Sequence, residues 1–168
     1  VQLDPRLTPA QNAQKYYTEY RKLDTAEKKL TELIASGKQE LVYIDSVFDA
    51  VSRTDSESDL AEIRRELREQ GYLKGGVRAD EKVKKTSEPL HFRSTEGFEI
   101  LVGRNNRQND QLTLKTAKAT DIWLHTQGIA GSHVIIRTEG RQPGEQTLFE
   151  AAQLAAFHSK GRSGSGVP

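Results

Sequence analysis

Cysteine and methionine are absent from the 168 residues of this chain, and tryptophan occurs once. The lack of cysteine excludes disulfides, thiolate nucleophiles and cysteine-based zinc sites, and is compatible with a reducing compartment. The sequence begins at Val1, so we interpret it as a piece excised from a longer protein. No apolar run reaches about 18 residues, so no transmembrane helix is expected within it, and no signal peptide is visible.

A strong excess of one charge is also lacking. The formal net charge is +1: residues 1–88 carry 16 basic and 17 acidic side chains, and residues 89–168 carry 9 and 7. A stand-alone nucleic-acid-binding domain usually has a larger basic excess. Any contact with RNA would therefore come from a local group of residues.

The first third of the chain predicts one long coiled-coil helix over residues 10–53. Twelve positions follow alternating steps of three and four residues, and ten of them are apolar, as in a heptad repeat. We call them the heptad stripe: Ala13, Tyr16, Tyr20, Leu23, Glu27, Leu30, Ile34, Gly37, Leu41, Ile44, Phe48 and Val51. Thr8, Pro9 and Gln11 have the pattern of a helix N-terminus.

A hairpin that turns at residues 35–38 is the alternative, but the heptad register continues through Gly37 and favours one helix. A single helix cannot bury such a stripe alone. We therefore expect a partner, which is either a missing coiled-coil helix of the parent chain or a second copy, giving a dimer. Asp55 or Ser56 can then cap a second helix that has Leu60, Ile63 and Leu67 on one face.

Three regions are expected along the chain: a coiled-coil region at 1–73, a linker at 74–88 and a small domain at 89–168. The linker is rich in glycine and lysine, and a solvated tether is favoured there over a phosphate site at residues 82–85.

In the small domain, alternation and turn signals predict strands at 90–93, 98–102, 121–125 and 132–137. A short helix carrying Leu112 and Leu114 is expected after Asn105 or Asn106. A final helix over 146–159 is expected to bury Leu148, Ala152, Ala155 and Ala156. The fold class is α+β: a long coiled-coil helix and a second short helix, then a small mixed α/β domain.

Five motifs follow one another in the small domain: GRNNRQND (103–110), DIWLH (121–125), GSHVII (131–136), EAAQLA (150–155) and SK (159–160). They resemble the C-terminal RNA-binding domain of the NFACT family, termed NFACT-R. The helical region resembles the middle region of the same family at LDP (3–5), NA (12–13) with Tyr16 and Tyr17, EL (40–41), EIR (62–64), EL (66–67) and GY (71–72). The resemblance covers nearly the whole chain.

This resemblance carries several expectations. Bacterial family members are known both as fibronectin-binding protein A and as ribosome quality-control factors. They contain an N-terminal tRNA-reading domain, a helix-hairpin-helix module and an outgoing coiled-coil helix, which we expect to lie outside this chain, and further strands after its C-terminal end. The intact protein is expected to bind a large ribosomal subunit holding peptidyl-tRNA, to recruit alanyl-tRNA and to promote a C-terminal alanine tail. Bond formation would belong to the ribosome, so no enzymatic activity is expected.

Twelve residues are candidates for RNA contact: Arg104, Asn105, Asn106, Arg107, Asn109, Asp121, Trp123, His125, Ser132, His133, Lys160 and Arg162. On a strand, Asp121, Trp123 and His125 would share one face that can stack on or hydrogen-bond to RNA. The alternative is that Trp123 packs under a helix, with the other two paired structurally.

The remaining candidates also have two interpretations. Backbone N–H groups at Ser132 and His133 can hold a phosphate, or Ser132 can simply stabilise the turn. The arginine and asparagine side chains of 104–109 offer donors, although asparagine is also a common helix cap. Lys160 and Arg162 follow a helix on a glycine- and serine-rich loop, which suits a phosphate contact or a solvated tail.

Nothing in the sequence resembles a nucleophile elbow, and the four histidines lack the spacing of a metal site, so we expect no catalytic residue, metal or cofactor. Two functions remain. One is a cytoplasmic factor that binds the large ribosomal subunit and tRNA, with RNA affinity that falls steeply with salt. The other is a cell-surface adhesin for fibronectin or fibrinogen. Replacing Arg104, Lys160 and Arg162 together by alanine is expected to abolish ribosome co-sedimentation in the first case.

Overall fold

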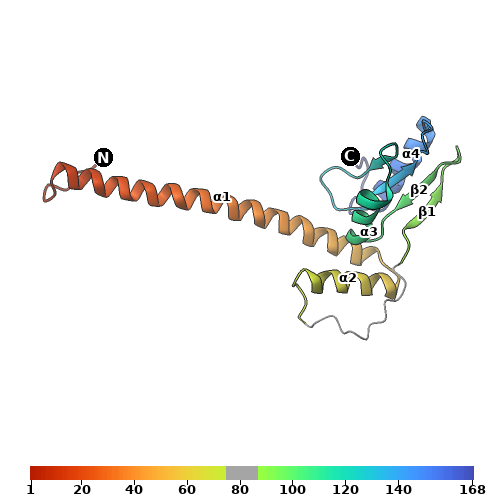
Figure 1. Cartoon of the computed structure of the whole chain (residues 1–168), viewed down its shortest axis with the longest axis horizontal. Coiled ribbons are helices and arrows are strands. Elements are labelled where there is room, and N and C mark those ends of the chain that lie inside the picture. The colour runs from red at the N-terminus through yellow and green to blue at the C-terminus, as the bar shows by residue number, and fades with distance from the viewer. Residues whose placement is uncertain (75–86) are drawn as a thin grey trace. The chain divides into compact units, whose positions relative to one another are not determined.

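The computed structural model describes residues 1–74 and 87–168 (Figure 1). The helices are α1 (Pro9–Arg53), α2 (Glu57–Glu69), α3 (Asn106–Gln111) and α4 (Glu145–Phe157), with a π-helical turn, η1 (Leu112–Thr116), directly after α3. The strands are β1 (Leu90–Arg93), β2 (Glu99–Val102), β3 (Ile122–Leu124) and β4 (Val134–Arg137). The chain forms two compact units, residues 1–42 and 43–168. Most of the predicted linker, with its lysines at 82–85, lies outside the described residues.

The start of α1 has the predicted reciprocal cap. The Thr8 N–H donates to Gln11 Oε1 at 2.9 Å, and the Gln11 N–H donates to Thr8 Oγ1 at 3.3 Å. Two of the N–H groups that a helix N-terminus leaves unpaired are satisfied in this way. The buried Asn12 adds a second tie, because its Oδ1 accepts from the Asp4 N–H at 2.9 Å.

Helix α1 continues through Gly37 without a break, so the single helix is confirmed and the hairpin alternative is wrong. A Cβ at Gly37 would meet no atom within 4 Å, so the glycine marks no close approach. In the first unit the large apolar residues of the heptad stripe from Tyr20 to Leu41 are 57% to 70% exposed. The predicted partner for this stripe stays a prediction.

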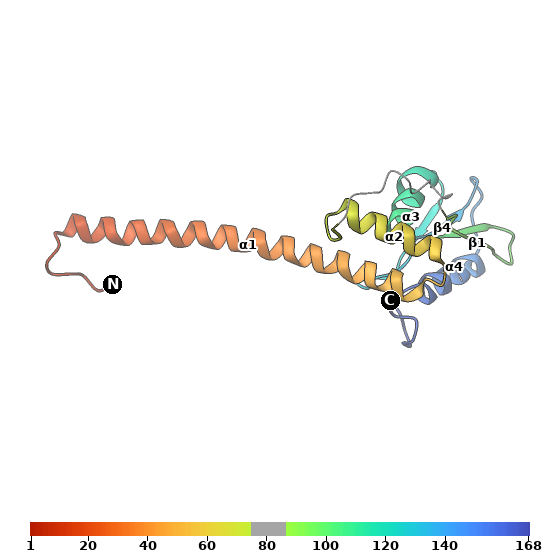
Figure 2. The ribbon, with the colours of Figure 1, turned by 90° about the horizontal axis from the view of Figure 1, so that it is seen from below.

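In the second unit, the last turns of α1 pack on α2 (Figure 2). Val47 and Ala50 of α1 meet Ile63 of α2 in a small buried cluster, with Tyr43 and Leu67 at its edge. Positions 43, 47 and 50 each precede a stripe position by one residue, which turns them by about 100° around the helix. The stripe residues at 44, 48 and 51 therefore remain exposed while the neighbouring face is buried.

The four strands form one antiparallel sheet in the order β1-β2-β4-β3. The predicted hairpin joins β1 to β2 through a turn that has Gly97 at φ 82°. One face of the sheet packs on α4 through a core that includes Ile100, Val134 and Ile136. On the other face, Leu101 and Ile135 are covered by Leu112 of η1.

The buried face expected for α4 is corrected in part: Ala155 is buried as predicted and Ala156 is half-buried, but two other predicted positions are exposed. Thr147, Ala151 and Ala155 are the buried residues, whereas Leu148 and Ala152 are exposed. The threonine can be buried because its hydroxyl donates to a Glu96 carboxylate oxygen and also forms a hydrogen bond with the Ser94 hydroxyl at 3.0 Å. The predicted short helix that carries Leu112 and Leu114 is observed as α3 followed by η1, and both leucines lie on η1: Leu112 is buried and Leu114 is exposed. Within the described residues, no helix is long and apolar enough to span a membrane.

Candidate nucleic-acid interface

Four of the candidate residues, 104–107, lie on the segment that follows β2. Each of them contacts an oxygen atom of α2 or of the last turns of α1. Arg104 Nη1 lies 3.3 Å from Asp59 Oδ2, Asn105 Nδ2 donates to Glu62 Oε2 at 2.9 Å, Asn106 Nδ2 donates to Ser46 Oγ at 2.9 Å, and Arg107 Nη1 lies 3.4 Å from Glu69 Oε2.

Their partners on α2 belong to an acidic stripe, which consists of Asp59, Glu62, Glu66 and Glu69. Steps of three and four residues place these carboxylates on one helix face. Asp59 and Glu62 are buried, and a buried carboxylate is costly unless it is paired or hydrogen-bonded. The motif at 104–107 supplies those partners, so it joins the small domain to α2.

Asn105 lies at the centre of the contact between residues 104–107 and the acidic stripe of α2, which we call the joint. Its Oδ1 caps α3 by accepting from the Gln108 N–H at 2.9 Å. Gln108, which the sequence analysis missed, donates from Nε2 to the Ser87 carbonyl at 2.8 Å, and the Ser87 N–H donates to Glu62 at 2.7 Å. A glutamine three residues after a helix cap is a known capping position, so this residue had a signal. The Asn105 donors expected for RNA are used inside the protein.

A second internal network occupies the turn before β4. The His133 N–H donates to Asn109 Oδ1 at 3.0 Å, and Asn109 Nδ2 donates to the Gly131 carbonyl at 3.3 Å. The Ser132 N–H donates to the His158 carbonyl at 2.9 Å. The predicted phosphate contact by the backbone of Ser132 and His133 is therefore corrected, because both N–H groups already have acceptors.

The buried Ser132 hydroxyl extends this network to α1. It donates to the Gly103 carbonyl and accepts from Arg53 Nη1 at 3.0 Å. Arg53 in turn pairs with Asp49 at 2.8 Å, and both of these side chains are nearly buried. Gly103 is held close: a Cβ there would lie 2.1 Å from Asn109 Oδ1. The glycine is thus required by packing.

The second group of candidates forms an aromatic cluster at the edge of the sheet: Trp123, His125 and His133. The Trp123 and His125 rings stack with centroids 5.8 Å apart and an interplanar angle of 15°, and the His133 ring meets both of them edge-on. The alternative that places Trp123 in the core is wrong, because 48% of this residue is exposed. Thr113 of η1, missed from the sequence, hydrogen-bonds to His133 Nδ1 at 2.7 Å.

Burial, together with the neighbouring His125, lowers the pKa of His133 below its ordinary value. At neutral pH this imidazole is therefore uncharged and can serve as a flat aromatic wall. Rings with an accessible face can stack on nucleobases whatever the base sequence. The aromatic cluster thus has the chemistry of a base-binding surface.

Asp121 does not join the aromatic cluster, which corrects the expected shared face. It precedes β3, its side chain is 1% exposed, and it accepts from the N–H groups of Lys118 at 2.9 Å and Thr138 at 3.0 Å. Arg137 Nε lies 3.2 Å from its Oδ2, in an ion pair without hydrogen-bond geometry. Asp121 therefore joins the start of β3 to the end of β4.

Lys160 and Arg162 lie on the loop after α4. Lys160 Nζ is 2.6 Å from Asp45 Oδ1 in an exposed ion pair, which contributes roughly 0–1 kcal/mol. Arg162 is exposed. Among the described residues, no group of three or more histidine and carboxylate side chains is placed to hold a metal ion.

Comparison with known proteins gives two family matches that together cover almost the whole chain. Residues 1–88 match the NFACT N-terminal and middle domains, and residues 88–165 match the NFACT protein RNA binding domain. The boundary at 88 differs from the division at 42/43 into compact units, because α2 and the last turns of α1 form hydrogen bonds and ion pairs with the small domain.

Two curated proteins named "Rqc2 homolog RqcH" are similar to this chain. The one from Bacillus subtilis is 42% identical over 170 residues, and the one from Streptococcus suis is 46% identical over 163 residues. They align with 100% and 96% of this chain, which spans 29% of each of them. A solved structure, the C-terminal part of the fibronectin/fibrinogen-binding protein from Streptococcus suis, is 43% identical with a TM-score of 0.84, covering 94% of this chain and 63% of that one.

Proposed function

We propose, from the premise that this chain belongs to the NFACT family, that it is the RNA-contacting part of a ribosome quality-control factor. The whole factor would bind a large ribosomal subunit holding peptidyl-tRNA, recruit alanyl-tRNA and promote a C-terminal alanine tail. Peptide-bond formation would belong to the ribosome, so the factor would need no catalytic residue of its own. It would work in the cytoplasm, where ribosomes are found.

The observation that carries this proposal is the half-exposed indole of Trp123. It lies on the edge strand β3, where neighbouring chain leaves part of the ring open. His125 stacks on it and His133 braces both rings edge-on. A ring held in one orientation loses little conformational freedom when a base stacks on it, and this favours binding.

The joint between residues 104–107 and the acidic stripe of α2 gives the first group of candidates a different role. These side chains fix the small domain against α2 and the last turns of α1. They would present the aromatic cluster in a constant orientation with respect to those helices. In this proposal they position the RNA-contacting surface and do not themselves contact RNA.

The test is co-sedimentation of the 168-residue chain with purified large ribosomal subunits carrying peptidyl-tRNA. Trp123→Ala is expected to weaken binding about 5- to 150-fold, because one base–aromatic stack contributes about 1–3 kcal/mol. Phe149→Ala is the matched control, since Phe149 is an exposed aromatic residue on α4 outside the aromatic cluster. Equal binding by the wild type and Trp123→Ala would contradict the proposal.

The triple substitution of Arg104, Lys160 and Arg162 suggested by the sequence is a poorer test. Arg104 is tied to the buried Asp59, so its removal would also loosen the joint. Arg162→Ala alone is preferable, because Arg162 is exposed and follows α4 on a loop. A loss of subunit binding without a change in unfolding would support a direct phosphate contact.

A fibronectin- or fibrinogen-binding role is the second candidate. The name of the similar Streptococcus suis structure favours it. The two candidates separate in one experiment, in which immobilised fibronectin is offered to the chain before and after ribonuclease treatment. Binding that survives ribonuclease and is unaffected by Trp123→Ala would favour the adhesin.

A further inference from the structure

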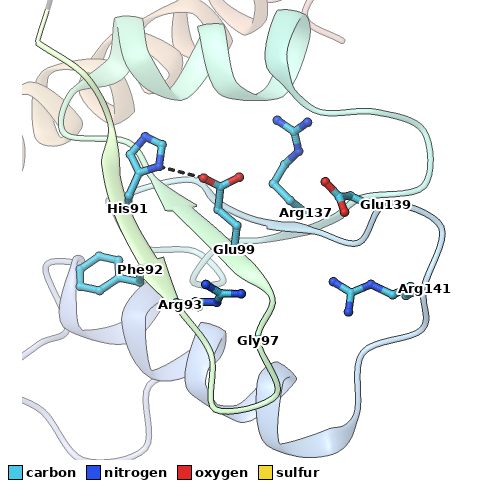
Figure 3. A pocket seen from close by; sticks show the side chains of 8 residues that line it. All are labelled: His91, Phe92, Arg93, Gly97, Glu99, Arg137, Glu139 and Arg141. Carbon is cyan, nitrogen blue, oxygen red and sulfur yellow. Dashed lines mark hydrogen bonds and ion pairs between the residues drawn. The ribbon is translucent and has the colours of Figure 1, made fainter.

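A second polar surface lies on the small domain, apart from the aromatic cluster. It is a pocket of about 470 Å³, which we call the arginine pocket (Figure 3). Its charged and polar lining comes from β1, β2, β4 and the loop after β4: His91, Arg93, Glu99, Arg137, Glu139 and Arg141. Three arginines from separate elements thus line one pocket.

Four residues that line the arginine pocket, His91, Arg93, Glu99 and Arg137, lie on the same face of the sheet as Trp123. Trp123 is paired with Ile135, Ile135 with Leu101, and Leu101 with His91. Directly paired residues of adjacent strands point to one face, so this row leads from Trp123 to His91. Leu112 of η1 covers the middle of the row. One strand of RNA that stacks on Trp123 can therefore follow this face around η1.

Two of the three guanidinium groups are free to bind an anion. Among the described residues, Arg93 has no ion-pair partner. Arg141 Cζ lies 4.3 Å from the centre of the Phe98 ring, a cation–π contact that does not use the guanidinium N–H groups, and within residues 1–74 and 87–168 Arg141 has no ion-pair partner. Arg137 is already paired with the buried Asp121, so it fixes the wall of the pocket.

We propose that the arginine pocket binds a phosphodiester group of the same RNA that stacks on Trp123. This inference rests on the proposed function and names a second contact for it. Guanidinium groups suit phosphate because their planar donor forks match two phosphate oxygens at once. A free inorganic anion would use the same groups, so the test must separate the two sources.

A carboxylate in the pocket, that of Glu99, provides a substitution that is expected to strengthen RNA binding instead of weakening it. Glu99 accepts from or shares a proton with His91 Nδ1 at 2.9 Å, and it repels a phosphate. Arg93→Gln with Arg141→Gln should weaken RNA binding, whereas Glu99→Gln should strengthen it. Arg64→Gln is the matched control, because Arg64 is an exposed arginine on α2 outside the pocket.

The measurement is the fluorescence anisotropy of dye-labelled oligouridylate and of dye-labelled transfer RNA, each titrated with the 168-residue chain over a range of salt concentrations. Each lost phosphate contact reduces the magnitude of the negative slope of log K against log [salt] by about 0.7 for a single strand. The double variant loses the one phosphodiester contact proposed here, so its slope should be smaller in magnitude by about 0.7. Trp123→Ala should instead weaken binding with little change in slope. Urea unfolding of every variant checks that the fold is kept.

The outcomes separate the two proposals. If the wild type binds neither RNA, the proposed function fails and this inference fails with it. If the wild type binds but the double variant keeps the wild-type slope on both probes, only the arginine pocket is overturned. If inorganic phosphate at constant ionic strength saturates the pocket without competing with either RNA, the site is a free-anion site, which also overturns the inference.

Discussion

Asn105 and Glu62 meet as a buried donor–acceptor pair, with Asn105 Nδ2 2.9 Å from Glu62 Oε2 across 43 residues of sequence. The same asparagine caps α3 through its Oδ1. One side chain therefore starts a helix and joins the small domain to α2. This gives a physical reason for an asparagine at this position, because an aspartate would keep the acceptor for the cap but would offer no donor to Glu62.

The first prediction concerns exchanging the amide of Asn105 and the carboxylate of Glu62. Asn105→Asp keeps the cap acceptor but places two carboxylates together, and should lower the free energy of unfolding by about 2–4 kcal/mol. Adding Glu62→Gln restores a donor and an acceptor in reversed order and should recover much of the loss. Urea unfolding of the four proteins gives the coupling energy. Additive effects of the two substitutions would show that the pair is not coupled.

The second prediction concerns Gly103. Gly103→Ala places a methyl group 2.1 Å from Asn109 Oδ1, so Asn109 must move and lose its bonds to His133 and Gly131. The expected cost is about 2–4 kcal/mol. Gly37→Ala is the contrasting control: its Cβ meets nothing within 4 Å, and helix propensity should stabilise it by about 1 kcal/mol. Thermal unfolding of both variants checks the difference in sign.

The elements of this fold were largely predictable because their signals are local. The capping pair Thr8 and Gln11, the heptad stripe and the hairpin turn at Gly97 all depend on residues a few positions apart. The π-helical turn at 112–116 was not predicted, since it depends on Leu112 packing over Ile135 from another part of the chain. On α4, Ala155 was predicted correctly, but Leu148 and Ala152 were wrongly expected to be buried, because Thr147 finds hydrogen-bond partners that only the folded hairpin supplies.

The candidate site was predicted less well for a related reason. A sequence shows which side chains carry donors, but it does not show whether acceptors in the same chain have used them. The acidic stripe of α2 was visible at steps of three and four residues, yet its pairing with residues 104–107 spans about 40 positions. Trp123 and His125 could be grouped because they alternate on one strand, whereas His133 and Thr113 join them only through tertiary packing.

The third prediction is a loss of stability in acid. Burial lowers the pKa of both His133 and His158 below the ordinary value of 6.5. Below that pH the unfolded chain binds more protons than the folded one, so acid favours unfolding. The stabilisation is complete above about pH 6.5 and is lost as pH falls toward the lowered values.

The midpoint of urea unfolding, measured from pH 8 to pH 5, checks this. His133→Asn and His158→Asn should each flatten the decline below pH 6.5, and the double variant should flatten it further. For His158, the positive charges of Arg53, Arg104 and Arg162 add to the effect of burial. A wild-type midpoint that rises as pH falls through this window would show that the imidazoles gain protons on folding, contrary to this prediction.

The last prediction concerns the partner of the heptad stripe. Leu30 and Ile34 are each 57% exposed, and burying apolar surface contributes about 25 cal/mol per Å². We therefore expect a second copy to cover the stripe, so that the chain sediments as a dimer.

Leu30→Glu with Ile34→Glu should give a monomer, because charges at a and d positions oppose coiled-coil pairing. Thr25→Glu with Thr31→Glu, which adds the same charge off the stripe, should leave the dimer intact. Sedimentation equilibrium distinguishes these states, and a monomeric wild type at high protein concentration would refute pairing between copies.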